Sequence, residues 1–343
     1  MNICFLMYPW DRIDPQFDST LRLVHECAAR EHRVAITSPG SLTIRDSVAH
    51  AFCDVIQNNR ISANVPTFYK QVEFKRSKLP LSGFDAIIMR ANPPLDTIAL
   101  NFLDQVRADT FIMNDIDGLR IANNKLYTAS FNDPASEFIP VTHVSKNRDY
   151  LERVINESEN ERMILKPLAG FAGRGVIVIE KSAKTSLRSL LDFYIGEGGG
   201  HYVILQEYVE GAEHGDVRIL MLNGEPIGAM KRVPAPGENR SNVHAGGTAV
   251  KHVLNRKEKA LCKAIGPKLV RDGLYFAGLD VIGGKLIEVN VLSPGGISRI
   301  NRLNRTKLQR QVIDFVESVV QTRESQVARK HEFRKVIEDA NSA

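Results

Sequence analysis

Two carboxylates and an amide lie close together within the apolar segment 278–296, GLDVIGGKLIEVNVLSPGG. We expect two short strands around a Gly-Gly turn, with Glu288 and Asn290 on one face because they are two residues apart. Asp280 lies on the first strand, within reach of both. Carboxylates in apolar sequence are costly unless paired, and hard oxygen ligands suit Mg²⁺, which commonly also binds substrate phosphates. The segment therefore predicts a magnesium site in a nucleotide-dependent enzyme, with Asp280, Glu288 and Asn290 as metal ligands.

The register of this hairpin decides whether the three ligands meet. A two-residue Gly-Gly turn would place Asp280 opposite Ile287 and Glu288 on the other face. A three-residue loop 283–285 with a glycine bulge would bring the ligands together. We expect the longer loop; the alternative is an ordinary hairpin whose polar residues face water.

A glycine-rich segment, LKPLAGFAGRGV (165–176), follows a lysine on a predicted strand. Glycines allow backbone N–H groups to approach phosphate oxygens, and Lys166 adds a positive charge. The segment is neither a Walker loop nor a dinucleotide fingerprint, because a strand pattern follows it instead of a helix. It predicts a flap over a triphosphate, formed by Gly170, Gly173 and Gly175; the alternative is a flexible hairpin loop.

Two weaker patterns could also contact a substrate. The segment LQEYVEG (205–211) reads as a strand whose backbone at 207–209 could bind an adenine edge, although a plain core strand fits the pattern better. Arg232, Arg240 and Asn242 lie on or beyond the entry to a long polar loop. Arginines there could hold a carboxylate or a phosphoryl group; the alternative is a solvated loop.

The elements that must position these residues change character along the chain. The first third alternates strands with helices, which predicts an open, largely parallel sheet, with Arg90 at the carboxyl end of one strand. The middle is β-rich and contains an Asn-Gly hairpin signal at 223–224. The end is helical. The expected strands are 3–8, 32–38, 84–90 and 110–114; the expected helices start near 19 and 96 and span 257–271 and 307–320.

Bulk properties exclude several classes of protein. The chain has 343 residues, enough for two or three packed units, and a net charge of +5 that does not demand a nucleic acid. Four scattered cysteines indicate free thiols in a reducing compartment. Neither a signal peptide nor a membrane span is apparent, so we expect a cytoplasmic protein. Serine-hydrolase and zinc-protease motifs are absent from the sequence.

Six strings in order carry a family resemblance: IIMRANPPLDT, NNKLYTASF, ILKPLAGFAGRG, RILMLNGEPIGAMKRVP, ENRSNVHAGG and GLDVIGGKLIEVNVLSP. With them the chain resembles the ATP-grasp superfamily, and within it the bacterial glutathione synthetases. The resemblance implies an α/β (α+β) ATP-grasp fold with an N-terminal open α/β domain, a small β-rich flap subdomain and a C-terminal antiparallel-sheet domain. The implied boundaries are 1–122, 123–204, 205–320 and a charged helical tail, 321–343.

The resemblance also implies roles for individual residues. Lys125 and Lys166 match phosphate-contacting lysines, and the three flap glycines match the mobile loop. Arg218 and Arg232, with Lys166, match the groups that act on the reacting carboxylate and phosphate. The adenine and ribose positions are Gln206, Glu207, Tyr208, Val209 and Asp216. The positions matched to the peptide and amine substrates are Arg90, Arg240, Asn242, Gly295 and Gly296.

The implied reaction joins γ-glutamylcysteine to glycine with ATP, through an acyl phosphate, and gives glutathione, ADP and phosphate. The implied cofactor is Mg²⁺, with Mn²⁺ as an alternative, and the implied assembly is a tetramer that binds neither nucleic acid nor membrane. The chain departs from the family pattern at Gly295-Gly296 and Arg299, where Thr-Cys and an acidic residue are usual. Two alternatives therefore stay open: a ligase for another peptide or amine, and a non-catalytic nucleotide-binding protein.

Overall fold

The computed structural model describes residues 1–57, 60–168, 175–182, 184–235 and 247–340. The chain divides into two compact units, which we describe separately. One unit combines residues 1–116 with the C-terminal segment that begins at Lys307, and the other comprises Asp117–Thr306. The predicted boundaries at 122, 204 and 320 are a finer division than these two units and stay a prediction.

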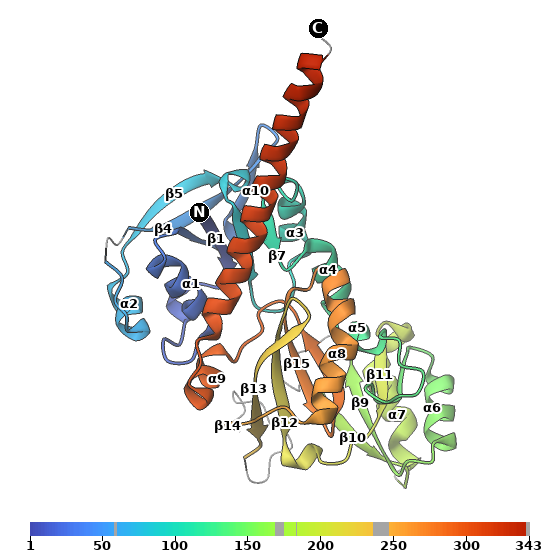
Figure 1. The fold of residues 1–343 in the computed structure, drawn as a ribbon. Coiled ribbons are helices and arrows are strands. Elements are labelled where there is room, and N and C mark those ends of the chain that lie inside the picture. The colour runs from blue at the N-terminus through green and yellow to red at the C-terminus, as the bar shows by residue number, and fades with distance from the viewer. Residues whose placement is uncertain (58–59, 169–174, 183, 236–246, 341–343) are drawn as a thin grey trace. The chain divides into compact units, whose positions relative to one another are not determined.

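The first unit is built on a mixed sheet in which the strand order is β3-β4-β2-β1-β6-β7, with β5 paired to β4 (Figure 1). Strands β2, β1, β6 and β7 run parallel, as predicted, whereas β3, β4 and β5 pair antiparallel. The strands are β1 (Asn2–Met7), β2 (Arg33–Thr37), β3 (Leu42–Arg45), β4 (Val48–Ile56), β5 (Phe74–Pro80), β6 (Ala86–Arg90) and β7 (Phe111–Met113).

Helices in this unit begin where the sequence carries capping residues. Asp18 accepts a hydrogen bond from the Leu21 amide (2.7 Å) and starts α1 (Ser19–Ala29), and Asp96 starts α3 (Thr97–Asp104) in the same way. The remaining helices are α2 (Val65–Gln71) and α10 (Leu308–Ala340), with α4 (Ile116–Ala122) at the junction with the second unit.

Helix α10 continues without a break through the segment predicted as a charged tail. Its first half packs against α1, where Arg30 forms ion pairs with Asp314 (2.7 Å) and Glu317 (2.9 Å). Residues 321–337 are all exposed. The second half of α10 therefore contributes little to the core of this unit.

The second unit contains two sheets. The four-stranded sheet has the order β10-β9-β11-β8, and α6 and α7 cover one of its faces (Figure 1). Its elements are β8 (Thr142–Ser145), α6 (Arg148–Glu157), β9 (Arg162–Pro167), β10 (Ile177–Glu180), α7 (Lys184–Ile195) and β11 (Val203–Glu207), preceded by the short α5 (Leu126–Ala129). Strands β9 and β10 are the pair predicted to flank the glycine-rich flap.

The five-stranded sheet of this unit is antiparallel throughout, with the order β14-β13-β12-β15-β16. Positive φ at both Asn223 (48°) and Gly224 (84°) confirms the predicted tight hairpin between β12 and β13. The elements are β12 (Asp216–Leu222), β13 (Glu225–Val233), β14 (Thr248–Lys251), α8 (Arg256–Arg271), β15 (Phe276–Ile282), β16 (Lys285–Asn290) and α9 (Ile297–Asn304).

All four cysteines are buried free thiols. Cys4 and Cys53 lie in the sheet of the first unit, Cys27 on α1 and Cys262 on α8. Within the described ranges, no helix has both the length and the apolar character that crossing a bilayer would require.

Candidate active site

The hairpin formed by β15 and β16 brings the three predicted metal ligands together, by a route that differs from the expected one. The turn is the two-residue Gly283-Gly284, with φ of +57° and +82°, so the expected three-residue loop is wrong. The extra residue is instead Ile287, inside β16, where the register shifts. Because of this bulge, Glu288 pairs with Asp280 across the two strands.

Four buried charges alternate in sign across strands β12, β13 and β15. The Asp280 carboxylate accepts hydrogen bonds from Arg218 Nε (2.5 Å) and Nη2 (2.9 Å), and pairs with Arg232 Nη2 (2.9 Å). Arg232 also donates two hydrogen bonds to Asp216, of which the one from Nε measures 2.8 Å. Two arginines and two aspartates thus form one neutral network.

The network fixes the charge of its members. Burial alone would raise the pKa of Asp280, but the charges of Arg218 and Arg232 outweigh it and lower the pKa to about 2. Burial alone would lower the pKa of Arg232, but Asp280 and Asp216 hold it above its ordinary value. Asp280 is therefore a carboxylate at every physiological pH, as a metal ligand must be.

Two lysines converge beside this network. Lys125, immediately before α5, forms an ion pair with Glu288 Oε1 (3.1 Å), and Lys166 on β9 donates to Gln206 Oε1 (2.9 Å). Burial is the main cause that lowers the pKa of Lys166 to about 8; the charge of Glu288 opposes this shift, and that of Lys125 adds to it. Two cationic side chains around one carboxylate suit an anionic ligand that arrives with a metal ion.

The donor set at this point fits magnesium. Asn290 donates through its amide nitrogen to Asp280 Oδ2 (3.3 Å) and to the Gly278 carbonyl (3.4 Å), which leaves its amide oxygen for a cation. Glu288 already holds the cationic end of Lys125, and its side chain keeps 30% of its surface exposed. No cluster of three or more His, Cys, Asp or Glu side chains forms among the described residues, so any metal here relies on two carboxylates and an amide.

The end of β11 is tied to the same hairpin. Lys285, the first residue of β16, donates to Glu207 Oε1 (2.5 Å), and the Glu207 amide donates to the Val141 carbonyl (2.9 Å). The ring of Tyr208 lies under the guanidinium of Arg162, 4.0 Å from its centroid. The Glu207 amide is thus used within the protein, and Tyr208 and Val209 lie beyond the end of β11.

Other predicted residues are spread more widely. Gly175 has a φ of +71°, and its carbonyl accepts from Tyr194 Oη (2.8 Å). The Gly295 carbonyl accepts from Arg218 Nη1 (3.3 Å), and Gly296 precedes α9. Arg90 is buried in the first unit, where its Nε donates to Thr20 (2.9 Å). Four predicted residues lie outside the described ranges: Gly170, Gly173, Arg240 and Asn242.

Several functional contacts were not expected from the sequence. Thr128 Oγ1 accepts a hydrogen bond from the Val289 amide (3.3 Å), between two predicted metal ligands. Tyr127 Oη donates to Asp272 Oδ2 (2.7 Å), which also accepts from Lys268 (2.7 Å) and so holds α5 against α8. Thr128 and Tyr127 lie in the string KLYT, in which only the lysine has a charge that signals chemistry.

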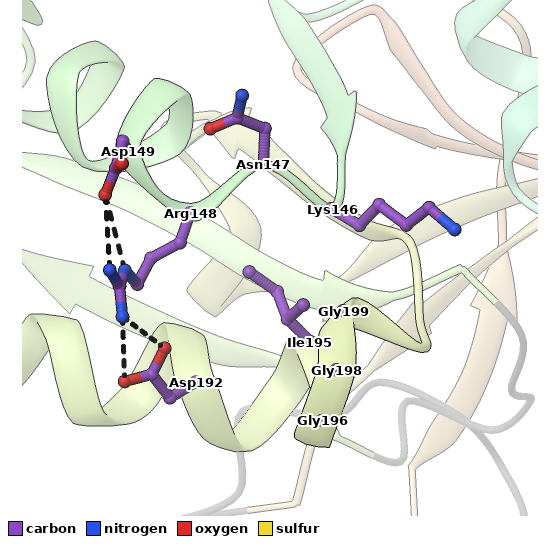
Figure 2. Close-up of a pocket in the computed structure, with 9 residues that line it drawn as sticks. All are labelled: Lys146, Asn147, Arg148, Asp149, Asp192, Ile195, Gly196, Gly198 and Gly199. Atoms are coloured by element: carbon purple, nitrogen blue, oxygen red, sulfur yellow. Dashed lines mark hydrogen bonds and ion pairs between the residues drawn. The ribbon is translucent and has the colours of Figure 1, made fainter.

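A separate cavity of about 430 Å³ lies at the start of α6, away from these residues (Figure 2). Figure 2 shows Arg148 directed at Asp192 and Asp149, and those ion pairs measure 3.1 and 3.4 Å. Lys146 points elsewhere and lies 4.9 Å from the centroid of the Tyr202 ring. None of the predicted site residues lines this cavity.

The fold is that of the ATP-grasp enzymes, as solved structures show. D-cycloserine synthetase DcsG superposes with a TM-score of 0.60 at 16% identity, covering 94% of this chain and 99% of that one. The ATP-grasp ligase PsnB, complexed with its minimal precursor, Mg and ADP, gives 0.59 at 14% identity, covering 93% and 98%. At such identities the likeness establishes the fold alone, and the predicted fold class is confirmed.

The chain belongs to the prokaryotic glutathione synthetase family. The N-terminal domain of that family matches residues 1–120, and its ATP-grasp domain matches residues 124–305. The glutathione synthetase of Thermosynechococcus vestitus is 35% identical over 93% of this chain and 100% of its own length. That of a Nostoc species is 34% identical over 94% and 99%. The predicted family, the use of ATP and the peptide-bond-forming ligase activity are thereby confirmed.

Proposed function

We propose that the chain joins γ-glutamylcysteine to glycine, with ATP converted to ADP and phosphate through an acyl phosphate. The observation that carries this proposal is the convergence of Lys125, Lys166, Asp280, Glu288 and Asn290 within one unit. Cations beside a carboxylate–amide metal site supply what phosphoryl transfer to a carboxylate needs, namely positioning and neutralised charge. The family match supports the same reaction.

Each charged side chain has a proposed task. Lys125 and Lys166 bind the triphosphate, and the arginines Arg218 and Arg232 bind the substrate carboxylate and then the oxyanion that forms when glycine attacks the acyl carbon. Asp280, Glu288 and Asn290 would hold Mg²⁺, which when bound neutralises part of the triphosphate charge; Mn²⁺ is the proposed alternative. The buried aspartates keep both arginines charged and aimed.

The remaining predicted roles stay proposals. The strand end at Gln206–Val209 would hold the adenine. Asp216 is proposed to meet the ribose, and this contact would require it to turn from Arg232. The flap glycines Gly170, Gly173 and Gly175 would exclude water from the acyl phosphate. Arg90, Arg240, Asn242, Gly295 and Gly296 would bind the peptide or amine. Cytoplasmic residence and a tetramer likewise stay predictions.

A different amine remains the second candidate, and one observation favours keeping it. A Cβ added at Gly295 would meet no atom within 4 Å, so glycine is not required there for space. At Gly296 the φ of +129° does favour glycine. The loss of side chains at this pair can thus reflect a different substrate contact as readily as a packing demand.

Magnesium-dependent ADP release, measured with γ-glutamylcysteine in the presence and absence of glycine, tests the proposal. We expect release that depends on glycine and a product with the mass of glutathione. Release only with another amine would transfer the proposal to that substrate pair. A protein that binds ATP but releases no ADP with any pair would contradict the ligase.

A further inference from the structure

Strand β16, which carries two predicted metal ligands, is an edge strand of its sheet. Only β15 pairs with it among the described strands, so one side of β16 presents backbone N–H groups that need other partners. Residues of the segment 125–138 cover that side. The Leu286 amide donates to the Phe138 carbonyl (2.7 Å), and the Val289 amide donates to Thr128 Oγ1 (3.3 Å).

The spacing of these two contacts follows from the bulge. In a regular strand, outward amides recur every second residue, so an outward Leu286 would be followed by an outward Glu288. The extra residue Ile287 shifts the pattern by one and turns the Val289 amide outward instead. The same bulge thus puts the Glu288 side chain on the same face of the hairpin as Asp280 and points the Val289 amide at Thr128.

Thr128 and Lys125 belong to the same helical turn, three residues apart, where side chains share a face. Lys125 contacts Glu288 (3.1 Å), and Thr128 contacts the next residue, Val289. Thr128 is 4% exposed, so its hydroxyl has little water to bond instead. Tyr127, between them, is anchored to Asp272 on α8. The turn that carries Lys125 and Thr128 therefore contacts β16 at two adjacent residues, Glu288 and Val289.

We propose that Thr128 is a positioning residue that fixes the separation between the phosphate-binding Lys125 and the metal ligands Glu288 and Asn290. The inference rests on the proposed function for the roles of those three residues. The hydroxyl acts through β16, because it accepts a hydrogen bond from the Val289 amide and so sets the register of α5 on that strand. Its loss lets the strand and the lysine move independently, so magnesium and ATP no longer meet in one fixed geometry.

The test compares Thr128→Val, which keeps the shape but removes the acceptor, with Thr128→Ser, which keeps the hydroxyl. The first readout is amide hydrogen exchange of the segment containing Val289, measured by mass spectrometry on the protein without metal or nucleotide. We expect exchange to accelerate about tenfold in the valine variant and to stay near wild type in the serine variant. Thr110→Val, which removes a buried hydroxyl in the first unit, is the matched control and should leave this segment unchanged.

The second readout is the dependence of ADP release on magnesium. In Thr128→Val we expect the half-saturating magnesium concentration and the KM for ATP to rise about tenfold, with a smaller loss in kcat. A wild-type exchange rate in the valine variant, or equal effects of valine and serine, would overturn the proposal. A wild-type protein that makes no glutathione would contradict the proposed function instead. The exchange experiment would still test whether Thr128 holds β16 through the Val289 amide.

Discussion

At the scale of single residues, the site contains carboxylates of two kinds. Asp280 is buried and shared by two arginines, whereas Glu288 is partly exposed and meets one lysine. Removing the negative charge of Asp280 leaves the two buried guanidinium groups of the network with one buried carboxylate, that of Asp216, which pairs with Arg232. Removing that of Glu288 leaves a lysine that can reach water. The two positions should therefore respond differently to the same chemical change.

Glu288→Gln should abolish turnover and change the free energy of unfolding by no more than about 1 kcal/mol, because a partly exposed ion pair contributes little. Asp280→Asn should also abolish turnover, but lower the free energy of unfolding by about 3 to 5 kcal/mol, because it breaks a buried network. Denaturant unfolding with ADP release measures both. Equal stabilities for the two variants would contradict the buried-network account, and turnover in Glu288→Gln would contradict its metal role.

Lys166 predicts a pH dependence. Its pKa of about 8 means that the free enzyme loses this positive charge as the pH rises past 8, so kcat/KM for ATP should fall by up to tenfold per pH unit above that point. In Lys166→Arg the charge persists, and the fall should disappear. A wild-type profile that stays flat to high pH would be inconsistent with a charged Lys166 binding phosphate.

The same pKa sets the sign of a stability effect. Lysine in the unfolded chain keeps its ordinary pKa of 10.5, above the folded value. Between about pH 8 and 10.5 the unfolded state therefore binds more protons, and the contribution of Lys166 to stability increases with pH. Below pH 8 the cost of burying its charge is fully present.

At the scale of elements, glycine is required where the backbones of two elements approach each other closely, as those of α8 and the β12–β13 hairpin do. Gly266 lies inside α8, where alanine would ordinarily stabilise the helix by about 1 kcal/mol. A Cβ at this position would lie 2.2 Å from the Gly224 carbonyl oxygen at the tip of the β12–β13 hairpin. The helix and the hairpin therefore touch through their backbones.

Gly266→Ala should accordingly lower the free energy of unfolding, by about 1 to 3 kcal/mol for overpacking, despite the better helix propensity. Thermal unfolding followed by circular dichroism measures the effect. Gly40→Ala is a suitable control, since a Cβ there would meet no atom within 4 Å. A stabilised Gly266→Ala would show that α8 can move away from the hairpin.

How far the sequence predicted these elements depended on local signals. The Asn223-Gly224 hairpin and the start of the helix near residue 19 carry their own local signals, and both were predicted correctly. The β3–β4 hairpin was missed because its turn, Asp46-Ser47, adopts positive φ without a glycine. The bulge at Ile287 was misplaced because the groups that accept hydrogen bonds from the amides on either side of it, Thr128 and Phe138, lie far away in sequence.

The candidate site shows the same limit. Lys125, Lys166, Asp280, Glu288 and Asn290 were predicted and do converge. The ion pairs around these residues could not be predicted. Arg232, which pairs with Asp280, also pairs with Asp216. The Asp216–Arg232 pair depends on the register between β12 and β13, which shifts between Leu220 and Met221.

At the scale of the whole molecule, helix α10 extends beyond the packed core. The match to the family's ATP-grasp domain ends at residue 305, before α10 begins. Residues 321–337 are exposed, and Arg323 lies 5.3 Å from the Phe111 ring, on the core side of that segment.

Truncation after Glu324 should therefore leave the free energy of unfolding within about 0.5 kcal/mol of the full chain and leave kcat unchanged. Denaturant unfolding and the ADP-release assay check both. Truncation after Leu308 serves as the contrasting variant, because it removes Asp314 and Glu317, the partners of Arg30. A large loss of activity on truncation after Glu324 would assign the exposed half of α10 a role in the reaction.

The burial of all four cysteines determines how this enzyme reacts with disulfides. In the proposed reaction the peptide substrate and the product are thiols, and their disulfides can exchange with protein thiols. Thiol–disulfide exchange requires an accessible thiolate. Burial keeps Cys27 protonated by raising its pKa well above the usual value, and raises the pKa of Cys262 to about 12. The hydrogen bond with Cys4 lowers the pKa of Cys53, but Cys53 is fully buried and so inaccessible to a disulfide. The folded protein should therefore gain no mass on incubation with glutathione disulfide, whereas the unfolded chain should react. An enzyme shielded in this way should keep its activity in the presence of glutathione disulfide.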